Sequence, residues 1–160
     1  MIDDVYLYNS VEVAAFIVAK ANENKLGINM TKLQKLLYIA YGTSLVIYGE
    51  RLTNEHPQAW PFGPVFPTTR NRLIKLDFDS INMDDPTIKN IKEEEKLKKL
   101  IDFVFEGFGK WTAKDLTAWS HKESSPWWTT KAMKDFKWGN HISDENIYNY
   151  FNAIIKKNGQ

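Results

Sequence analysis

Apolar residues recur at helical spacing along most of the chain, and the clearest pattern runs from Thr31 to Tyr48. Its apolar and small positions, three and four residues apart, predict a helix with one buried face; they are Leu33, Leu36, Leu37, Ala40, Ser44 and Tyr48. Thr31 and Gln34 have the spacing of a capping box, so we expect the helix to begin at Thr31. Lys32 and Lys35 fall outside the apolar stripe, and we expect both side chains to be solvated.

Other segments combine the same period with residues that favour helix starts. Candidate N-caps are Ser10, Thr112, Ser125 and Ser143. Ser125 is followed by a proline, which suits the first position of a helix. We expect these further helices over about residues 11–24, from Pro64 or Pro67 to about Leu76, over 91–108, over 112–121, from Pro126, and from Ser143 to Ile154.

Residues 60–67 form a corner that the sequence makes stiff. Pro61, Pro64 and Pro67 each fix their own φ and keep the preceding residue out of the α region. Gly63 lies between them and can adopt a positive φ. This stiffness exceeds what a simple connection between helices needs.

The segment before the corner, residues 51–60, has too few periodic apolar residues for a helix and favours an extended segment or hairpin arm. Residues 1–160 are therefore predicted to be mainly α, a single compact helical domain of about six or seven helices with at most a small β-hairpin near 51–60. A mass of 18.6 kDa and a hydrophobic content of 43% provide enough material for one core.

Composition excludes several kinds of chemistry. The chain has no cysteine, which rules out disulfides, thiol nucleophiles and Cys-ligated zinc. No apolar run approaches the ~20 residues of a membrane span, and residues 1–5 are acidic where a signal peptide is basic. We expect a cytoplasmic protein without a membrane partner.

His121 is the side chain that most favours an enzyme. Asp115 and Glu123 lie close to it in sequence and could orient its imidazole as a general base. The sequence has no recognisable nucleophile motif, glycine-rich phosphate loop or zinc-binding spacing. We expect a structural His121, no metal, no cofactor and no enzymatic activity, with a catalytic His121 as the alternative.

A second alternative is a phage-encoded regulator that binds nucleic acid. Arg72 and Lys75 are one helical turn apart and Arg70 lies off that line. The net charge of +1 provides little attraction for a polyanion. The near-neutral balance argues against this function.

Aromatic residues are abundant, at 14% of the chain. Most are expected in the core, but Trp127 and Trp128 are adjacent, and neighbouring side chains on a helix diverge by about 100°. One of the two should therefore face a rim or a groove. Exposed tryptophan beside arginine is typical of protein-binding surfaces.

Several short motifs resemble the Panacea antitoxin domain family, also described as SocA-like or phage-associated proteins. They occur in the family's order between about residues 10 and 130. The motifs are Thr31-Lys-Leu-Gln-Lys-Leu-Leu-Tyr38, Gly49-Glu-Arg-Leu52, Ala59-Trp60, Gly63-Pro64-Val65-Phe-Pro67, Leu116-Thr-Ala-Trp119-Ser-His121 and Ser125-Pro126-Trp127.

This resemblance implies a toxin-neutralising protein of a bacterial or phage toxin–antitoxin system that binds a cognate toxin directly. The alternative that it implies is a proteolytic adaptor that delivers the toxin to a ClpXP-type protease. We expect the partner-binding surface to comprise Trp60, Phe62, Pro64, Arg70, Trp127 and Trp128. Residues expected to shape the motif are Leu33, Leu36, Leu37, Tyr38, Gly63, Pro64, His121 and Pro126.

Overall fold

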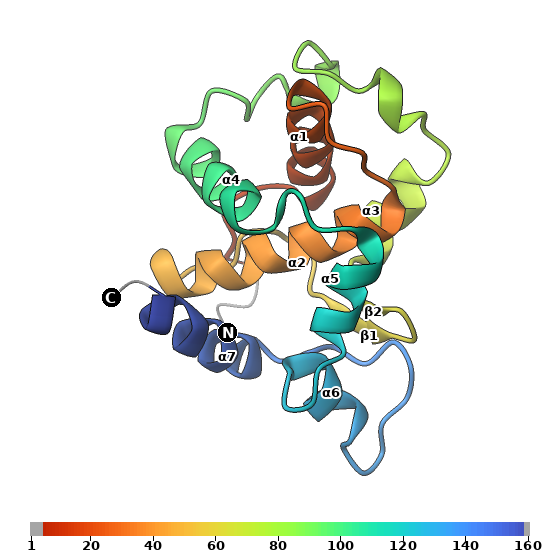
Figure 1. Cartoon of the computed structure of the whole chain (residues 1–160), viewed down its shortest axis with the longest axis vertical. Coiled ribbons are helices and arrows are strands. Elements are labelled where there is room, and N and C mark those ends of the chain that lie inside the picture. The colour runs from red at the N-terminus through yellow and green to blue at the C-terminus, as the bar shows by residue number, and fades with distance from the viewer. Residues whose placement is uncertain (1–4, 159–160) are drawn as a thin grey trace.

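Helix α2 (Met30–Ile47) is the axis of the fold, and every side chain from Lys32 to Leu45 on it is buried. In the computed structural model, which describes residues 5–158, helices α1, α4, α5 and α7 all pack against α2 (Figure 1). The sequence predicted a helix with one buried face, whereas α2 is buried on all faces. Leu33, Leu36, Leu37 and Tyr38 lie in this core with at most 1% of their surface exposed.

The other elements follow the mainly α class predicted from the sequence, with seven α-helices and one two-stranded sheet in the described part of the chain. Two short 3₁₀ turns, at residues 78–80 and 86–88, lie between α3 and α4. The remaining helices and strands are α1 (Ser10–Glu23), β1 (Gln58–Trp60), β2 (Gly63–Val65), α3 (Pro67–Leu73), α4 (Glu95–Phe108), α5 (Ala113–Ser120), α6 (Pro126–Lys131) and α7 (Asp144–Asn158).

The expectation that Lys32 and Lys35 are solvated is wrong. Their side chains are only 6% and 1% exposed. A stripe pattern identifies a solvated face only where one side of the helix meets water, and α2 has neighbours on every side. The apolar stems of the two lysines are therefore part of the interior.

Two of the expected N-caps are also wrong, and the helix expected from residue 91 begins at Glu95. Asn29, rather than Thr31, caps α2 by accepting a hydrogen bond from the Lys32 backbone N–H at 2.9 Å. Asn9, rather than Ser10, caps α1 in the same way. The N-caps expected at Thr112, Ser125 and Ser143 are confirmed by side-chain bonds to the first turns of α5, α6 and α7.

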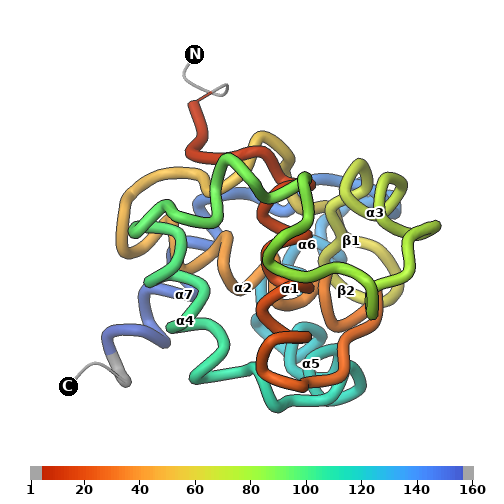
Figure 2. Tube along the Cα trace, turned by 90° about the horizontal axis from the view of Figure 1, so that it is seen from above, coloured from red at the N-terminus to blue at the C-terminus, as the bar shows by residue number. Residues whose placement is uncertain are grey.

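A small hairpin is present as predicted, but it lies at residues 58–65 rather than near 51–60, so its second strand is part of the corner; β1 and β2 pair antiparallel with Trp60 opposite Gly63. Gly63 has φ +114°, and Pro67 begins α3, which ends at Leu73 rather than near residue 76. Residues 139–142 bond to the outer edge of β1, so the hairpin is fixed on both sides. Figure 2 shows that the hairpin and α3 lie at the end of the molecule opposite α4 and α7.

No helix in the described residues combines the length and apolar character needed to cross a membrane.

Candidate functional site

The hairpin turn projects one aromatic side chain into solvent. Phe62 is 70% exposed, and Trp60 at the end of β1 is half-buried. The Arg70 guanidinium lies 5.7 Å from the centre of the Trp60 ring, a cation–π arrangement that connects α3 to the turn. The corner therefore presents aromatic area with a neighbouring positive charge.

Gln34 on α2 fixes the corner from beneath. The Phe66 backbone N–H donates to Gln34 Oε1 at 2.7 Å, and Gln34 Nε2 donates to the Phe66 carbonyl oxygen at 3.4 Å. Both partners are buried, so each bond satisfies a group that would be costly to leave unpaired. This role, which replaces the expected capping box, joins the central helix to the end of the hairpin.

Glu55 secures the next turn. Its carboxylate accepts bonds from the backbone N–H groups of Thr68 and Thr69 at the start of α3, and from the hydroxyl groups of Thr69 and Ser10. Phe66, the residue before α3, provides no side-chain cap. A carboxylate at this position satisfies unpaired donors of the first turn.

Trp127 fixes the hairpin from its other side. This side chain is 4% exposed, and its Nε1–H donates to the Trp60 carbonyl oxygen at 2.8 Å. Trp128 is 40% exposed, so the expected divergence of the two rings is confirmed. Pro64 is buried in β2. Trp127 and Pro64 therefore support the surface from within, although the sequence interpretation placed them in the contact area.

His121, like Trp127, contacts the hairpin. Its ring stacks on Trp127 with centroids 3.9 Å apart, and it bonds to the Phe62 backbone. Burial lowers the pKa of His121, the positive charges of Lys35 and Lys131 lower it further, and the Phe62 bond partly offsets both. Its surroundings therefore favour the neutral form of the ring.

These contacts do not assemble the catalytic arrangement considered from the sequence. Within the described residues, neither Asp115 nor Glu123 is hydrogen-bonded to His121, and its Nε2 is buried without a partner. The stacking on Trp127 and the Phe62 bond are those of a packing residue at the C-terminus of α5. In residues 5–158, no group of three or more His, Asp or Glu side chains could hold a metal ion.

Lys35 lies directly beneath the hairpin turn. A Cβ on Gly63 would lie 2.6 Å from Lys35 Cε and 2.8 Å from Ser120 Oγ, so only glycine fits this contact. Burial lowers the pKa of Lys35 to about 8, and no carboxylate of the described residues forms an ion pair with it. An unpaired buried ammonium group is costly to keep, which makes Lys35 a conspicuous feature of the corner.

The structure thus brings the six sequence-predicted contact residues to one region but divides them by role. We use the name aromatic surface for the exposed parts of Trp60, Phe62, Arg70 and Trp128; α6, which carries Trp128, packs against β1. Sequence reasoning missed the supporting residues Gln34, Lys35 and Glu55 because their roles depend on contacts between distant segments. It also missed Trp138 and Lys131, which lie beside Trp127.

In the sequence, the signal that indicated this region was the order of the family-like motifs along the chain. The family model described as "Antitoxin SocA-like, Panacea domain" matches residues 33–128, which include most of α2, the whole hairpin and both tryptophans of α6. The chain is also 35% identical over 130 residues to the protein named Antitoxin SocA from Caulobacter vibrioides (strain NA1000 / CB15N). That match covers 72% of this chain and 66% of the relative, a little less than two thirds of its length. No solved structure is significantly similar.

Proposed function

Because the chain belongs to the family of SocA-like antitoxins with a Panacea domain, we propose that it neutralises a toxin protein by binding that toxin directly through the aromatic surface. Membership of the family supports the antitoxin role. The observation that supports this particular surface is Phe62, a large apolar side chain left 70% exposed on a hairpin whose backbone is fixed from several sides.

The rigidity of the hairpin favours tight binding. Ordering a flexible loop on association lowers affinity, and a loop that is already fixed avoids that loss. The Trp60 carbonyl is bonded to Trp127, and the Phe66 backbone is bonded to Gln34. The backbone that carries Phe62 is therefore already fixed before the toxin binds.

The composition of the surface indicates what it contacts. Phe62 and Trp128 provide apolar area that an apolar depression on the toxin would bury. Arg70 lies over Trp60 and retains guanidinium donors for a toxin carboxylate at the rim. Binding there blocks the covered part of the toxin without any chemical step, which agrees with a family that is generally non-enzymatic.

Co-expression tests this proposal. The partner used in the test is the product of an adjacent gene, chosen because it arrests growth when expressed alone. We expect the intact chain to restore growth and to co-purify with that product, and Phe62→Ala, Trp128→Ala and Arg70→Ala each to weaken both effects. Trp111→Ala is the matched control, because Trp111 is 37% exposed, against 40% for Trp128, and does not belong to the aromatic surface. Full rescue by all three surface variants would exclude this surface.

Delivery of the toxin to a ClpXP-type protease is the second mechanism that the family allows, and it uses the same first contact. The two mechanisms differ in the fate of the toxin. Direct neutralisation leaves the toxin intact in a stable complex, whereas delivery shortens its half-life only in cells that contain the protease. A pulse-chase of the toxin in cells with and without the protease separates them, and we expect an unchanged half-life.

A further inference from the structure

A groove lies between α4 and α7, the two helices that Figure 2 places away from the hairpin. It has a volume of about 520 Å³. Its floor is Ile39 and Thr43 of α2, and its walls include Phe103 of α4 and Ile155 of α7. Phe103 is 46% exposed, and Glu106 is the one charged residue among those that line the groove in the described chain.

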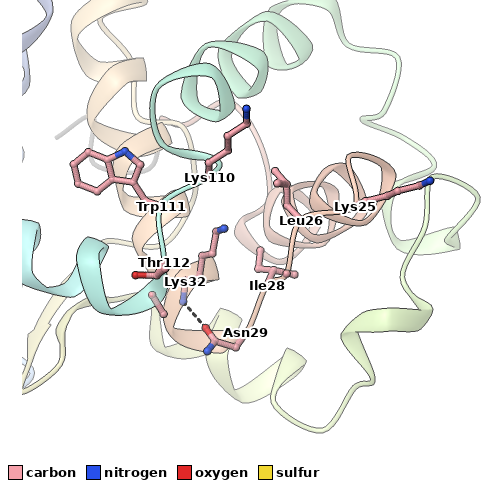
Figure 3. A pocket seen from close by; sticks show the side chains of 10 residues that line it. Lys25, Leu26, Ile28, Asn29, Lys32, Lys110, Trp111 and Thr112 are labelled. Carbon is pink, nitrogen blue, oxygen red and sulfur yellow. Dashed lines mark hydrogen bonds between the residues drawn. The ribbon is translucent and has the colours of Figure 1, made fainter.

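A second hollow of about 520 Å³ adjoins this groove, and its charge is entirely positive. Lys25, Lys32 and Lys110 line it, and no Asp or Glu is among its described lining residues. Figure 3 shows the Lys32 side chain directed toward the middle of the hollow, while Lys25 and Lys110 extend from its rim. Lys32 Nζ donates to the Gly109 carbonyl oxygen at 2.7 Å, and burial lowers the pKa of Lys32.

Trp111 joins the two features because it lines both of them. Its ring lies 5.1 Å from that of Phe108, which lines the groove. The apolar groove and the basic hollow therefore meet at Trp111. We call the two together the groove surface.

We propose that the groove surface binds an amphipathic helix of a partner protein, with the apolar stripe of that helix in the groove and its acidic end at the three lysines. A groove bounded by two helices and floored by a third has the shape that accepts a further helix along its length. The three lysines fix the charge of the end that lies beyond Trp111 and therefore the direction of the bound helix. This inference is independent of toxin neutralisation, which we assign to the aromatic surface.

Gly107 offers a way to block the groove without harming the fold. It is an exposed residue of α4 that lines the groove, and a Cβ built on it meets no atom within 4 Å. Gly107→Trp would fill the groove entrance from outside the core. Gly107→Ala is the matched control, since a single methyl group leaves the groove open.

The test selects binders to the full chain from a displayed library of helical peptides that carry one apolar stripe and randomised charges. We expect the enriched peptides to share Asp or Glu at one end. We expect their binding to be lost with Gly107→Trp, kept with Gly107→Ala, and weakened about tenfold, or 1.4 kcal/mol, with Lys25→Glu and Lys110→Glu combined. Phe62→Ala should leave peptide binding unchanged, even if toxin neutralisation fails.

Three results would overturn the inference: no enrichment of helical peptides, equal enrichment on Gly107→Trp, or enriched peptides without a preference for a terminal acid. Sedimentation of the free chain tests whether a second copy of the chain fills the groove instead. A dimer that Gly107→Trp dissociates would show that a second copy of the chain, rather than a partner helix, fills the groove.

Discussion

The corner and the groove surface are both exposed and partly apolar, but they are built in opposite ways. At the corner, buried side chains from α2 and α6 fix the backbone so that Phe62 projects from it. At the groove, α4 and α7 each pack on α2 and leave a space between them. A projecting contact requires a fixed backbone, whereas a receiving groove requires unfilled volume.

One glycine at each site shows this difference. Gly63 at the corner has φ +114° and lies against Lys35 and Ser120. Gly107 at the groove is helical and has open space where a Cβ would be. The same residue type is therefore required at the first site and replaceable at the second.

Gly63→Ala should have the largest effect. The positive φ costs about 1–3 kcal/mol for a residue with a Cβ, and the close contact with Lys35 Cε adds an overpacking cost of about 1–3 kcal/mol. We expect the free energy of unfolding to fall by about 3 kcal/mol, measured by urea denaturation. A loss below about 1 kcal/mol would contradict the tight contact beneath the turn.

Lys35→Met should stabilise the protein at neutral pH. The pKa of Lys35 falls from 10.5 to about 8 on burial, which corresponds to about 3 kcal/mol of destabilisation while the group is charged in both states. Between pH 8 and pH 10.5 the unfolded chain binds a proton that the folded chain has released, so the stability of the wild type rises with pH in this window. The advantage of Lys35→Met should therefore be greatest below pH 8 and shrink toward pH 10.5.

Denaturation of the wild type and Lys35→Met at several pH values checks this expectation. The difference between the two proteins removes the contributions of other titrating groups. Lys114→Met, which changes an exposed lysine, is the control and should show almost no difference at any pH. An advantage of Lys35→Met that does not depend on pH would mean that packing rather than charge causes it.

Gln34→Leu should destabilise the corner by about 2 kcal/mol, because it leaves the buried N–H and C=O of Phe66 without partners. Gln34→Glu retains an acceptor for the N–H and loses the donor to the carbonyl. Thermal unfolding of both variants measures the loss. Hydrogen exchange of the Phe66 amide should accelerate in Gln34→Leu. An unchanged exchange rate would contradict the role of the two Gln34–Phe66 hydrogen bonds.

Gly107→Ala should have the smallest effect and should stabilise the protein slightly. Alanine favours a helix over glycine by about 1 kcal/mol, so the free energy of unfolding should rise by about 0.5–1 kcal/mol. Gly109→Ala is a useful contrast, because a Cβ there would lie 2.6 Å from the Phe105 carbonyl oxygen. Destabilisation by Gly107→Ala would show that the space beside Gly107 is not open.

The sequence predicted the helical class, a small hairpin, three of the five proposed N-caps and the divergence of Trp127 from Trp128. These features depend on local spacing and caps, which lie within a few residues of one another. The burial of Lys32 and Lys35 could not be predicted in this way, because a helical period does not reveal how many neighbours surround a helix. The roles of Gln34 and Glu55 were missed for the same reason, since they bond to residues far along the chain.

The affinity of the purified chain for its toxin tests the central claim most directly, with Phe62→Ala and Trp111→Ala compared by isothermal titration calorimetry. We expect Phe62→Ala to weaken binding about tenfold or more, as a central aromatic contact does, with folding stability unchanged because the side chain is exposed. Trp111→Ala should bind the toxin like the wild type. Wild-type affinity in Phe62→Ala together with a loss in Trp111→Ala would contradict the claim and move toxin binding from the corner to the groove surface.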